Sequence, residues 1–448
     1  MKIVVCMKIS GGEPNPFDEA ALECALKIGG DITVISMCPK SAQDALKRIT
    51  RLGVRAVLIS DSAYAGSDTL ATGHILSGAV RILKPDLILC GRQSIDGDTA
   101  QVGPCLATLC GMPVITNVMQ MPEIGETVRC HTRLGKEEAK LPCLLTIERI
   151  FKLRFPRLGS KTGRVDIWDN SIIKADISRC GLRGSPTRVL KTFENKRGQR
   201  RCRFIERSEL LPLIESLKTA ETVKKTSVNG GARLKEVWTI GALEEARAVA
   251  ENITVISEKD PIKIAALARE YKPEVILWNA DLWGRKNAPI AAALLSTGLC
   301  ADCTALETDG DRLFMYRPAR SGSVTAKIEC VTRPQMATVR TQTDSGDIIV
   351  SGGKGVADKL NELREFAALI GAETGASRGL VDLGAASYDM QIGLTGKMVS
   401  PKIYIAVGIS GAVHHTCAIE NAGTVIAINP DRNARIFEYA DYGIIGEF

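Results

Sequence analysis

The sequence is poor in aromatic residues and has no long apolar run. Aromatic residues make up 4% of its 448 residues, which argues against the base-stacking platforms of single-stranded nucleic-acid-binding domains. No uninterrupted apolar stretch approaches the ~18–20 residues of a membrane helix, which excludes an integral membrane protein. The apolar run Ile3–Met7 is too short for a signal-peptide core and predicts a buried strand.

Histidine is scarce as well, which limits the metal sites the chain can build. It has four histidines and fourteen cysteines, the latter without regular spacing. In the absence of an export signal, these cysteines favour reduced, buried thiols and a cytoplasmic location. One C-x-x-C pair, Cys300 and Cys303, leaves a redox or zinc role open, although a zinc site would need a second ligand pair.

Charge is distributed unevenly along the chain. The net charge is +7, yet residues 151–205 alone hold fifteen Lys and Arg against four Asp and Glu. Such a segment could bind nucleic acid or an acidic partner. It could also be a solvated arm between domains, and this second interpretation is preferred.

Short β-branched runs alternate with amphipathic helical stretches from the first residues onward. Predicted strands in the first 150 residues are Lys2–Lys8, Asp31–Met37, Ala56–Ser60 and Asp86–Cys90. Predicted helices between them are Asp18–Ile28, Ala42–Leu52 and Asp68–Leu83. This alternation predicts an α/β fold with a parallel sheet covered on both faces. A ligand is then expected where the loops after Cys6, Met37, Ser60 and Cys90 converge.

Two further alternating series follow an interruption. From Phe151 to about Leu211 the chain is rich in Pro, Gly and Arg, which predicts an irregular extended arm. The second series has predicted strands Asn252–Ser257 and Val275–Trp278, and helices Pro261–Tyr271 and Pro289–Ser296. The third has predicted strands Asp347–Val350, Ile403–Gly408 and Val425–Asn429. The fold class expected is therefore α/β, with three parallel-sheet units and an arm.

Glycine-rich loops in the third series indicate a ligand site. A strand runs into Gly352-Gly-Lys-Gly355, where bare glycines let backbone N–H groups approach an anion. Its spacing does not match the P-loop. Three more loops of small residues follow, at 375–378, 391–397 and 408–415. Together they suit a ligand with phosphates and a polar ring system.

The first series contains a candidate phosphate site of its own. The segment Cys90–Pro104 leaves a strand and opens a helix, and Asp98 or Thr99 stands near the expected cap. N–H groups at a helix start can cradle a phosphate. The alternative is a capped helix that binds nothing. A similar but weaker helix start occurs at Gly66–Thr69.

These motifs resemble those of electron transfer flavoproteins. The C-terminal half resembles the alpha subunit through Thr297–Cys303, Arg333–Arg340, the loops at Ser351, Gly375 and Gly393, and the segments Gly408–His415, Ala427–Asn429 and Ala440–Gly443. The N-terminal half resembles the beta subunit through Asn15–Glu19, Gly66–Thr69, Gly91–Pro104, Leu141–Thr146 and Gly184–Arg188. The resemblance implies a single-chain fusion, beta then alpha.

The family also implies a division into domains. It gives a beta-like nucleotide-binding domain at 1–175, a beta-like arm and fusion linker at 176–235, an alpha-like N-terminal domain at 236–340 and an FAD-binding domain at 341–448. The two domains other than the FAD-binding one would be of the adenine-nucleotide alpha hydrolase type.

The resemblance places FAD in the C-terminal domain. Carried over by motif, the residues at this cofactor are Lys354, Ser377, Arg378, Ile392, Gly393, Leu394, Thr395, Ser410, Gly411, Ala412, Val413, His414, His415 and Asn429. Arg378 near the flavin N5 and His415 near the pyrimidine end would favour negative charge on reduced flavin. Asn429 is expected on the adenosine side.

In this family the N-terminal site holds either AMP or, in the electron-bifurcating branch, a second FAD. The residues implied are Asp98, Thr99, Gln101, Val102 and Gly103. AMP-type members tend to have Asn where Ala100 stands and Thr where Val102 stands. The run is therefore closer to the bifurcating branch, which favours FAD.

The expected function is electron transfer on FAD between a dehydrogenase or NADH and a redox partner. The resemblance implies partners such as an acyl-CoA dehydrogenase type of enzyme or a quinone oxidoreductase, and it does not imply nucleic acid. Two alternatives stay open: a two-FAD, NADH-oxidising bifurcating enzyme, and a degenerate nucleotide-binding interaction protein.

Overall fold

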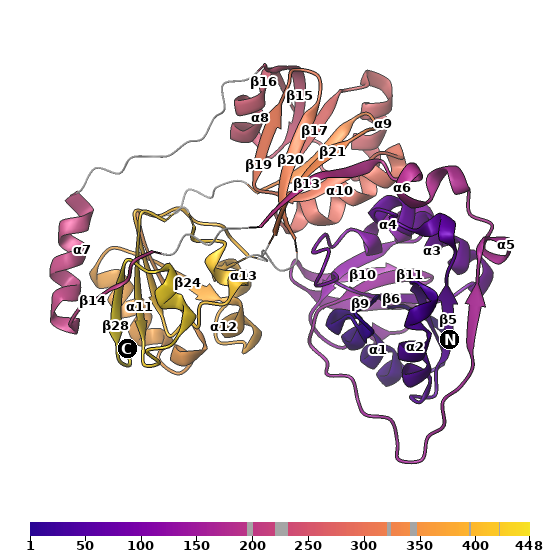
Figure 1. Cartoon of the computed structure of the whole chain (residues 1–448), viewed down its shortest axis with the longest axis horizontal. Helices are drawn as coiled ribbons and strands as arrows, with labels where there is room; N and C mark the ends of the chain where they lie inside the picture. The colour runs from indigo at the N-terminus through magenta and orange to yellow at the C-terminus, as the bar shows by residue number, and fades with distance from the viewer. Residues whose placement is uncertain (195–199, 220–231, 320–323, 341–346, 394–395, 421) are drawn as a thin grey trace. The chain divides into compact units, whose positions relative to one another are not determined.

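The chain forms two compact units, which are described one at a time. The computed structural model describes residues 1–194, 200–219, 232–319, 324–340, 347–393, 396–420 and 422–448 (Figure 1). The first unit comprises Met1–Thr192, Gly230–Arg320 and Ala326–Arg340. The second comprises Phe193–Asn229, Ser321–Thr325 and Thr341–Phe448.

A large, mainly parallel sheet forms the N-terminal half of the first unit. Its strands run in the order β10 (Gly135–Lys140), β9 (Thr127–Thr132), β7 (Val114–Val118), β11 (Cys143–Ile147), β6 (Leu87–Gly91), β1 (Lys2–Cys6), β4 (Asp31–Met37), β5 (Arg55–Ile59) and β12 (Val165–Trp168). The short β8 (Glu123–Ile124) pairs with β9, and β7, β8 and β10 meet β9 antiparallel. All other neighbours are parallel.

Helices cover both faces of this sheet, as its continuous apolar strands require. Buried residues of α1 (Pro16–Ile28) and α2 (Gln43–Thr50) pack on one face, for example Leu22 and Leu46. Buried residues of α3 (Thr69–Leu83) and α4 (Val102–Leu109) pack on the other, for example Ile75 and Leu106. Figure 1 shows the two helix pairs on opposite sides of the indigo sheet.

The C-terminal half of the first unit contains two smaller sheets. A parallel sheet runs in the order β16 (Ala250–Val255), β15 (Leu234–Ile240), β17 (Val275–Asn279), β22 (Gln335–Val339) and β18 (Leu299–Cys303). Its helices are α8 (Leu243–Val249), α9 (Pro261–Tyr271) and α10 (Leu282–Leu295). The other sheet runs β13 (Thr187–Glu194), β21 (Val324–Cys330), β20 (Leu313–Ala319) and β19 (Ala305–Thr308).

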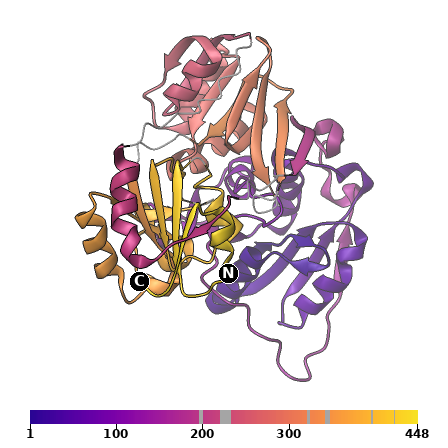
Figure 2. The same cartoon turned by 60° about the vertical axis from the view of Figure 1, so that its left-hand side comes forward.

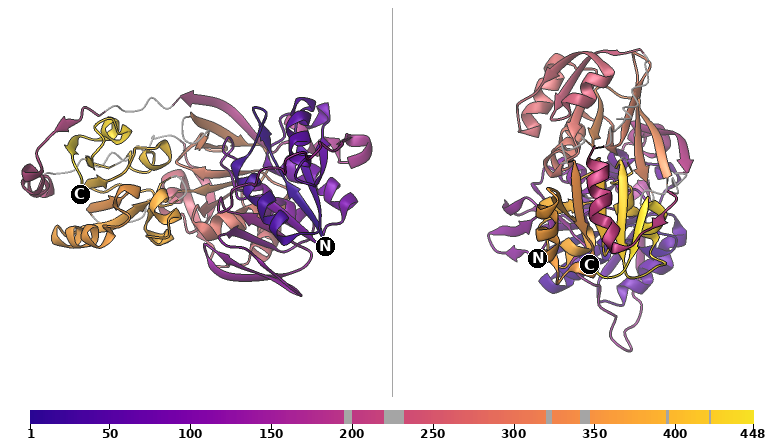
Figure 3. Two further views of the ribbon diagram at one scale, coloured as in Figure 1. Left: turned by 90° about the horizontal axis from the view of Figure 1, so that it is seen from below. Right: turned by 90° about the vertical axis from the view of Figure 1, so that its left-hand side faces the viewer.

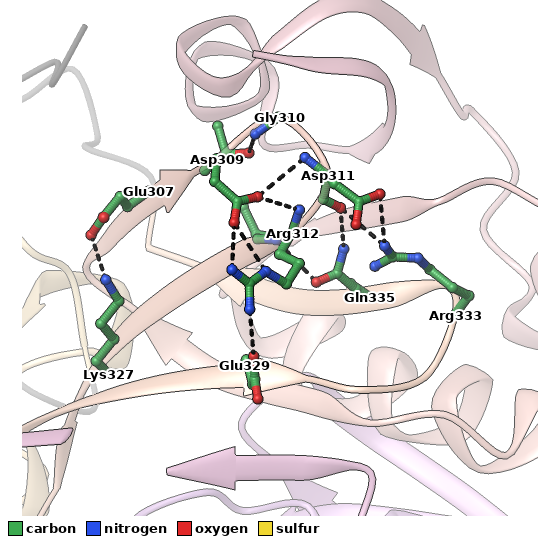
Figure 4. Close-up of polar contacts among 11 residues, drawn as sticks. Glu307, Asp309, Gly310, Asp311, Arg312, Lys327, Glu329, Arg333 and Gln335 are labelled. Atoms are coloured by element: carbon green, nitrogen blue, oxygen red, sulfur yellow. Dashed lines mark hydrogen bonds and ion pairs between the residues drawn. The ribbon is translucent and has the colours of Figure 1, made fainter. Parts of the chain in front are cut away.

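A network of charged side chains fixes the turn between β19 and β20 (Figure 4). Arg312 donates to Asp309 at 2.7 Å, and Arg333 pairs with Asp311 at 3.4 Å. Beneath them the fully buried Gln335 accepts from the Leu313 N–H at 3.0 Å. The network therefore ties this turn to the segment that enters β22.

The second unit is built on a parallel sheet of seven strands. The order is β14 (Arg203–Phe204), β28 (Tyr442–Ile445), β27 (Thr424–Asn429), β26 (Ile403–Val407), β23 (Ile348–Gly352), β24 (Glu373–Ser377) and β25 (Gln391–Ile392). Helices α7 (Leu210–Thr219) and α11 (Leu360–Leu369) share a core with one face, while residues such as Tyr404, Ile436 and Phe437 fill the other. Two short helices, α12 (Arg378–Asp382) and α13 (Val413–Thr416), follow β24 and β26.

Residues 200–219 belong to this second unit although more than a hundred residues separate them from Thr341–Phe448, its main segment. Arg203 and Phe204 pair with Tyr442 and Gly443, which adds β14 to the edge of the sheet. Leu210 and Ile214 of α7 are buried in the same core as Ile348. In Figure 2 and the right-hand view of Figure 3, the magenta helix lies across the yellow strands of this sheet.

The α/β class and most elements agree with the sequence analysis. The strand at Asp31–Met37 and the helix at Pro261–Tyr271 match to the residue. The prediction of irregular chain from Phe151 to Leu211 was wrong in part, because β12, α5 (Asn170–Ile173), β13 and β14 lie within it. The strand β15 was missed. The four domain boundaries stay a prediction.

Within the described ranges, no helix combines the length and apolar character needed to cross a membrane.

Candidate functional sites

The first candidate site lies at the point where the strand order of the large sheet reverses. From β1 the chain proceeds to β4 and β5 on one side, and then to β6 and β11 on the other. In open α/β sheets, ligands bind outside the carboxyl ends of the strands at such a point. A cavity of about 330 Å³ lies there, lined by residues that follow β1 and β6 and by the start of α3. Its volume is at the lower end of the range for small-molecule sites.

Asp18 holds the two sides of this reversal point together. Its carboxylate accepts from the Lys8 N–H at 2.8 Å and from the Gly91 N–H at 2.9 Å, at the ends of β1 and β6. Burial raises the pKa of Asp18 to about 6, while the hydrogen bonds act in the opposite direction. The buried Asp18 side chain therefore links the ends of β1 and β6 and lines the cavity.

Polar side chains near Asp18 hold the loop that follows β6. The buried Asn15 donates to the Gln93 carbonyl at 2.9 Å and accepts from the Ile95 N–H at 3.3 Å. The Lys8 ammonium pairs with Asp96 at 2.7 Å. These contacts fix the path of the loop between β6 and α4.

Positive charge lies in the cavity wall. Arg92 is 7% exposed and lines the cavity. The Glu148 carboxylate is shared between Arg133, at 2.6 Å, and Arg92, at 3.4 Å. Two guanidinium groups thus face one carboxylate, and Arg92 and Lys8 supply positive charge to a cavity wall that also contains Asp18 and Asp68.

The loop from 98 to 101 has the backbone form of an anion-binding turn. Asp98 and Ala100 are left-handed, with φ of 51° and 55°, whereas Gln101 is right-handed. Adjacent residues of opposite hand turn their N–H groups toward one point. Left-handed residues other than glycine are costly and concentrate at functional sites. The helix begins at Val102, so the expected cap at Asp98 or Thr99 was wrong: Gln101 is the N-cap residue.

The structure brings four of the five predicted N-terminal residues to this cavity. Thr99, Gln101, Val102 and Gly103 line it. Asp98 is buried beside it and accepts from the Gln93 side chain at 3.0 Å. The Gln101 side chain is held between the Thr69 hydroxyl, at 2.8 Å, and the Leu299 carbonyl, at 3.2 Å, which leaves its backbone to face a ligand.

Sequence reasoning missed Lys8, Asn15 and Asp18 as cavity residues. The available signal was the polar Asn15–Glu19 segment, which directly follows the first strand and opens a helix. Asp68 was noted only as a helix start. It caps α3 through Ala71 N–H at 3.0 Å and also accepts from the Thr187 hydroxyl at 2.7 Å.

The second candidate site lies at the reversal point of the seven-stranded sheet, between β23 and β26. Here two backbones approach so closely that a Cβ on Gly353 would lie 2.0 Å from the Gly408 carbonyl oxygen. A Cβ on Gly411 would lie 2.1 Å from the Ile436 nitrogen, and Gly411 has a φ of 84°. The glycines are therefore required by the packing of these loops.

The four glycine-rich loops meet at this edge. A Cβ on Gly379 would lie 2.7 Å from Cε of Lys354, so the lysine stem crosses the start of α12. A Cβ on Gly393 would lie 2.9 Å from the His414 carbonyl oxygen. These close approaches bring the loops after β23, β24, β25 and β26 together into a cradle of bare backbone at one edge of the sheet.

Two polar side chains stand at the start of α12. Ser377 caps the helix by accepting from the Leu380 N–H at 3.4 Å. Arg378 follows it and pairs with Asp382 at 3.2 Å. The Arg378 guanidinium is thus fixed by Asp382 and is partly exposed at the edge of the cradle.

His415 is buried beneath the cradle. Its Nε2 lies 2.8 Å from the Tyr404 hydroxyl and its Nδ1 lies 3.1 Å from the Ile392 carbonyl oxygen. Burial lowers the pKa of His415 to about 4, so the ring is neutral at pH 7. The imidazole joins the loops after β25 and β26 without adding charge.

The remaining predicted residues lie on the same loops. Ser410, Ala412 and His414 are exposed, Val413 is half-buried, and Ile392 and Gly411 are buried. The Asn429 side chain donates to the Ile409 carbonyl at 2.9 Å, which links the loops after β26 and β27. Leu394 and Thr395 lie outside the described residues.

Cys300 and Cys303 are both buried within β18, near its start and at its end. The Cys303 thiol donates to the Cys300 carbonyl at 3.6 Å. A metal-binding group of three or more His, Cys, Asp or Glu side chains is absent from the part of the chain that the structure describes.

The fold and the two strand-order reversals define an α/β protein with one candidate ligand site in each of its two units. Comparison with known families agrees. The model for "Electron transfer flavoprotein domain" matches residues 3–172 and 262–360, and that for "Electron transfer flavoprotein FAD-binding domain" matches residues 342–420.

Individual relatives are of both subunit types. The chain is 41% identical over 231 residues to electron transfer flavoprotein subunit alpha of Thermoanaerobacterium thermosaccharolyticum, covering 41% of this chain and 70% of the relative. It is 39% identical over 228 residues to subunit beta of Clostridium acetobutylicum, covering 43% of this chain and 87% of the relative. It is 38% identical over 232 residues to Protein FixB of Bradyrhizobium diazoefficiens, covering 41% of this chain and 63% of the relative.

The chain therefore belongs to the electron transfer flavoprotein family, and it joins a beta-like N-terminal part to an alpha-like C-terminal part. It spans roughly two thirds of the length of the FixB and alpha-type relatives.

Proposed function

We propose that this protein carries electrons on an FAD bound at the carboxyl edge of the seven-stranded sheet. The donor is a dehydrogenase or NADH, and the acceptor is a redox partner such as a quinone oxidoreductase. The observation that carries the proposal is the cradle of Gly353, Gly393 and Gly411, where side chains are excluded by backbone a few ångströms away. The match of residues 342–420 to an FAD-binding domain supports it.

The residues of the cradle bind and orient the cofactor in this proposal. FAD supplies the one- and two-electron chemistry when bound. Backbone N–H groups of the loop after β26, beyond Gly408, hold the phosphates, and Asn429 stands on the adenosine side. Arg378 stabilises the negative charge of reduced flavin. His415 is neutral and engaged with Tyr404, so its role is to fix the loop that carries Gly393.

The N-terminal cavity is proposed to hold an adenine nucleotide. The left-handed turn at Ala100, the start of α4 and the positive charge of Arg92 suit a phosphate. The sequence favours FAD over AMP here, which would make the protein a two-flavin, NADH-oxidising enzyme and a candidate for bifurcation. The volume of about 330 Å³ is at the lower end of the range for small-molecule sites, so part of an FAD would extend from the mouth.

The test is nucleotide content, measured anaerobically. The protein is purified, heated to release its nucleotides, and FAD and AMP per chain are quantified. One FAD plus one AMP supports a simple carrier, whereas two FAD, bleached by NADH, supports the two-flavin enzyme. Neither nucleotide, even after incubation with FAD, would leave only the degenerate binding protein.

A variant assigns each nucleotide to its site. In Gly103→Ala, the new Cβ would lie 2.5 Å from Cγ2 of Thr146 and displace the start of α4. This variant should lose the N-terminal nucleotide and keep the C-terminal FAD. Loss of the C-terminal FAD with retention of the other would reverse the assignment.

A further inference from the structure

The floor of the N-terminal cavity is made in part by two cysteines on adjacent strands. Cys6 ends β1, and Cys90 lies in β6 directly opposite it in the parallel register. Both line the cavity, and they are 8% and 5% exposed. Ile35 of β4 occupies the same cross-sheet row and also lines the cavity.

The geometry suits a bond between the two sulfurs. In-register neighbours on adjacent strands lie about 4.8 Å apart and point to the same face of the sheet. That separation is within the range of about 4.4–6.8 Å between the Cα atoms of a disulfide.

The two cysteines differ in their surroundings. The hydrogen bond to Cys6 and burial hold the pKa of Cys90 well above its ordinary value. The Cys90 thiol is therefore protonated at neutral pH. Apart from the cavity, both side chains are surrounded by the apolar core that includes Ile88 and Leu106. A small reagent must therefore reach them through the cavity.

We propose that Cys6 and Cys90 form an oxidant-sensitive dithiol, which a peroxide converts to a disulfide when the nucleotide cavity is empty and which a bound nucleotide shields. Cys6 first reduces the peroxide, giving a sulfenic acid and one water. The Cys90 sulfur then attacks the Cys6 sulfur, and the hydroxyl leaves with the Cys90 proton as a second water. The shielding part rests on the proposed nucleotide site, whereas the pairing of the thiols does not.

The experiment uses the full-length protein with its nucleotides removed, treated with hydrogen peroxide alone, with saturating AMP, or with saturating FAD. Non-reducing peptide mapping by mass spectrometry follows the Cys6–Cys90 cross-link, and equilibrium dialysis measures binding of each nucleotide independently. In the empty protein the cross-link should form, and it should form at least about tenfold more slowly with a nucleotide that binds.

Control variants separate pairing from general oxidation. Cys90→Ser should leave Cys6 as a sulfenic acid that dimedone traps. Cys24→Ser is the matched control, because Cys24 is a fully buried thiol packed in the core on the opposite face of the sheet. It should leave the rate of the Cys6–Cys90 cross-link unchanged.

Each of the remaining outcomes refutes either the dithiol or its shielding by a nucleotide. No cross-link in the empty protein, or a bond from Cys6 to Cys110 instead, overturns the dithiol. Equal rates with and without a nucleotide that dialysis shows to be bound overturn the shielding. Absence of binding of either nucleotide refutes the proposed N-terminal nucleotide site, and with it the shielding, while the cross-link alone still decides the dithiol.

Discussion

Gly353 and Gly408 are in contact across the reversal point of the seven-stranded sheet. A Cβ on Gly353 would clash with the Gly408 carbonyl oxygen. The Gly353 N–H donates to the Val407 carbonyl at 2.8 Å, and the Gly408 N–H donates to the Ile428 carbonyl at 2.9 Å. The first residue after β23 is thereby bonded to the end of β26, and the first residue after β26 is bonded to β27. The cradle is thus a property of main-chain packing more than of any one side chain.

Gly353→Ala should abolish tight FAD binding by the second unit. The added methyl would lie 2.0 Å from the Gly408 oxygen, so one of the two loops must move. We expect FAD affinity to fall by at least about tenfold and the unit to lose roughly 1–3 kcal/mol of stability. Gly125→Ala is the control, since its Cβ would be 3.6 Å from the nearest atom. FAD titration followed by flavin fluorescence measures the affinity of both variants. Equal affinities would contradict the proposal that FAD binds at the Gly353 cradle.

His415 should make the second unit less stable as the pH falls from about 6.5 to 4. In this window the unfolded chain binds a proton at position 415 and the folded protein does not, so the free energy of unfolding decreases with falling pH. The full effect is about 3 kcal/mol, and no further change from this residue is expected below pH 4.

The measurement is hydrogen exchange of peptides from β25 and β26 at pH 7.0 and 5.0, corrected for intrinsic rates. His415→Gln should remove most of the pH dependence. His414→Gln is the matched control, because His414 is the exposed neighbour. An unchanged pH dependence in the first variant would show that the buried imidazole is not its source.

Arg200→Ala should loosen the attachment of residues 200–219 to the second unit. The Arg200 guanidinium donates to the Ala422 carbonyl at 2.7 Å and the Gly423 carbonyl at 3.2 Å, and it pairs with Asp441. Because the site is partly exposed, we expect a loss of about 1–2 kcal/mol. Limited proteolysis near residue 200 should become faster. The adjacent, exposed Arg201→Ala should behave as wild type, and equal effects of both changes would argue against a specific anchor.

Asp382→Asn should raise the reduction potential of the bound flavin, if Arg378 contacts it as proposed. Asp382 neutralises Arg378 through the 3.2 Å ion pair, so its removal leaves more positive charge for the reduced cofactor. We expect a positive shift of about 10–30 mV, where 30 mV for a two-electron couple corresponds to about 1.4 kcal/mol. Spectroelectrochemistry measures it. The exposed Asp358→Asn in the same unit serves as control, and a negative shift in Asp382→Asn would place Arg378 away from the flavin.

The local hydrophobic pattern was sufficient to predict elements whose apolar residues follow one clear period. Asp31–Met37 and Pro261–Tyr271 are continuous apolar or clearly amphipathic segments, and both were predicted to the residue. Val165–Trp168 was missed because it is an edge strand with two exposed residues out of four, paired with a strand more than a hundred positions earlier. Nothing local in the sequence specifies such a partner.

The candidate sites divide in the same way. The glycine-rich loops of the second unit could be recognised in the sequence because small and polar residues directly follow predicted strands there. The structure brings the described residues of these loops to one edge of the sheet. The site at the ends of β1 and β6 was expected from the sequence, and Cys6, Met37 and Cys90 do line the cavity. Asp18 was not recognised as a cavity residue, because it looks like an ordinary part of its helix.

The interleaving of the two units has a consequence for synthesis on the ribosome. The arm of residues 200–219 is made long before β28, the strand it pairs with. At translation rates of about 5–20 residues per second, the apolar side of α7 waits on the order of ten to forty seconds for its binding surface. During that time Leu210 and Ile214 have no core to enter. The exposed apolar side of α7 therefore needs protection from aggregation on the nascent chain. A C-terminal fragment that begins between residues 219 and 341 would lack β14, a strand of its own sheet.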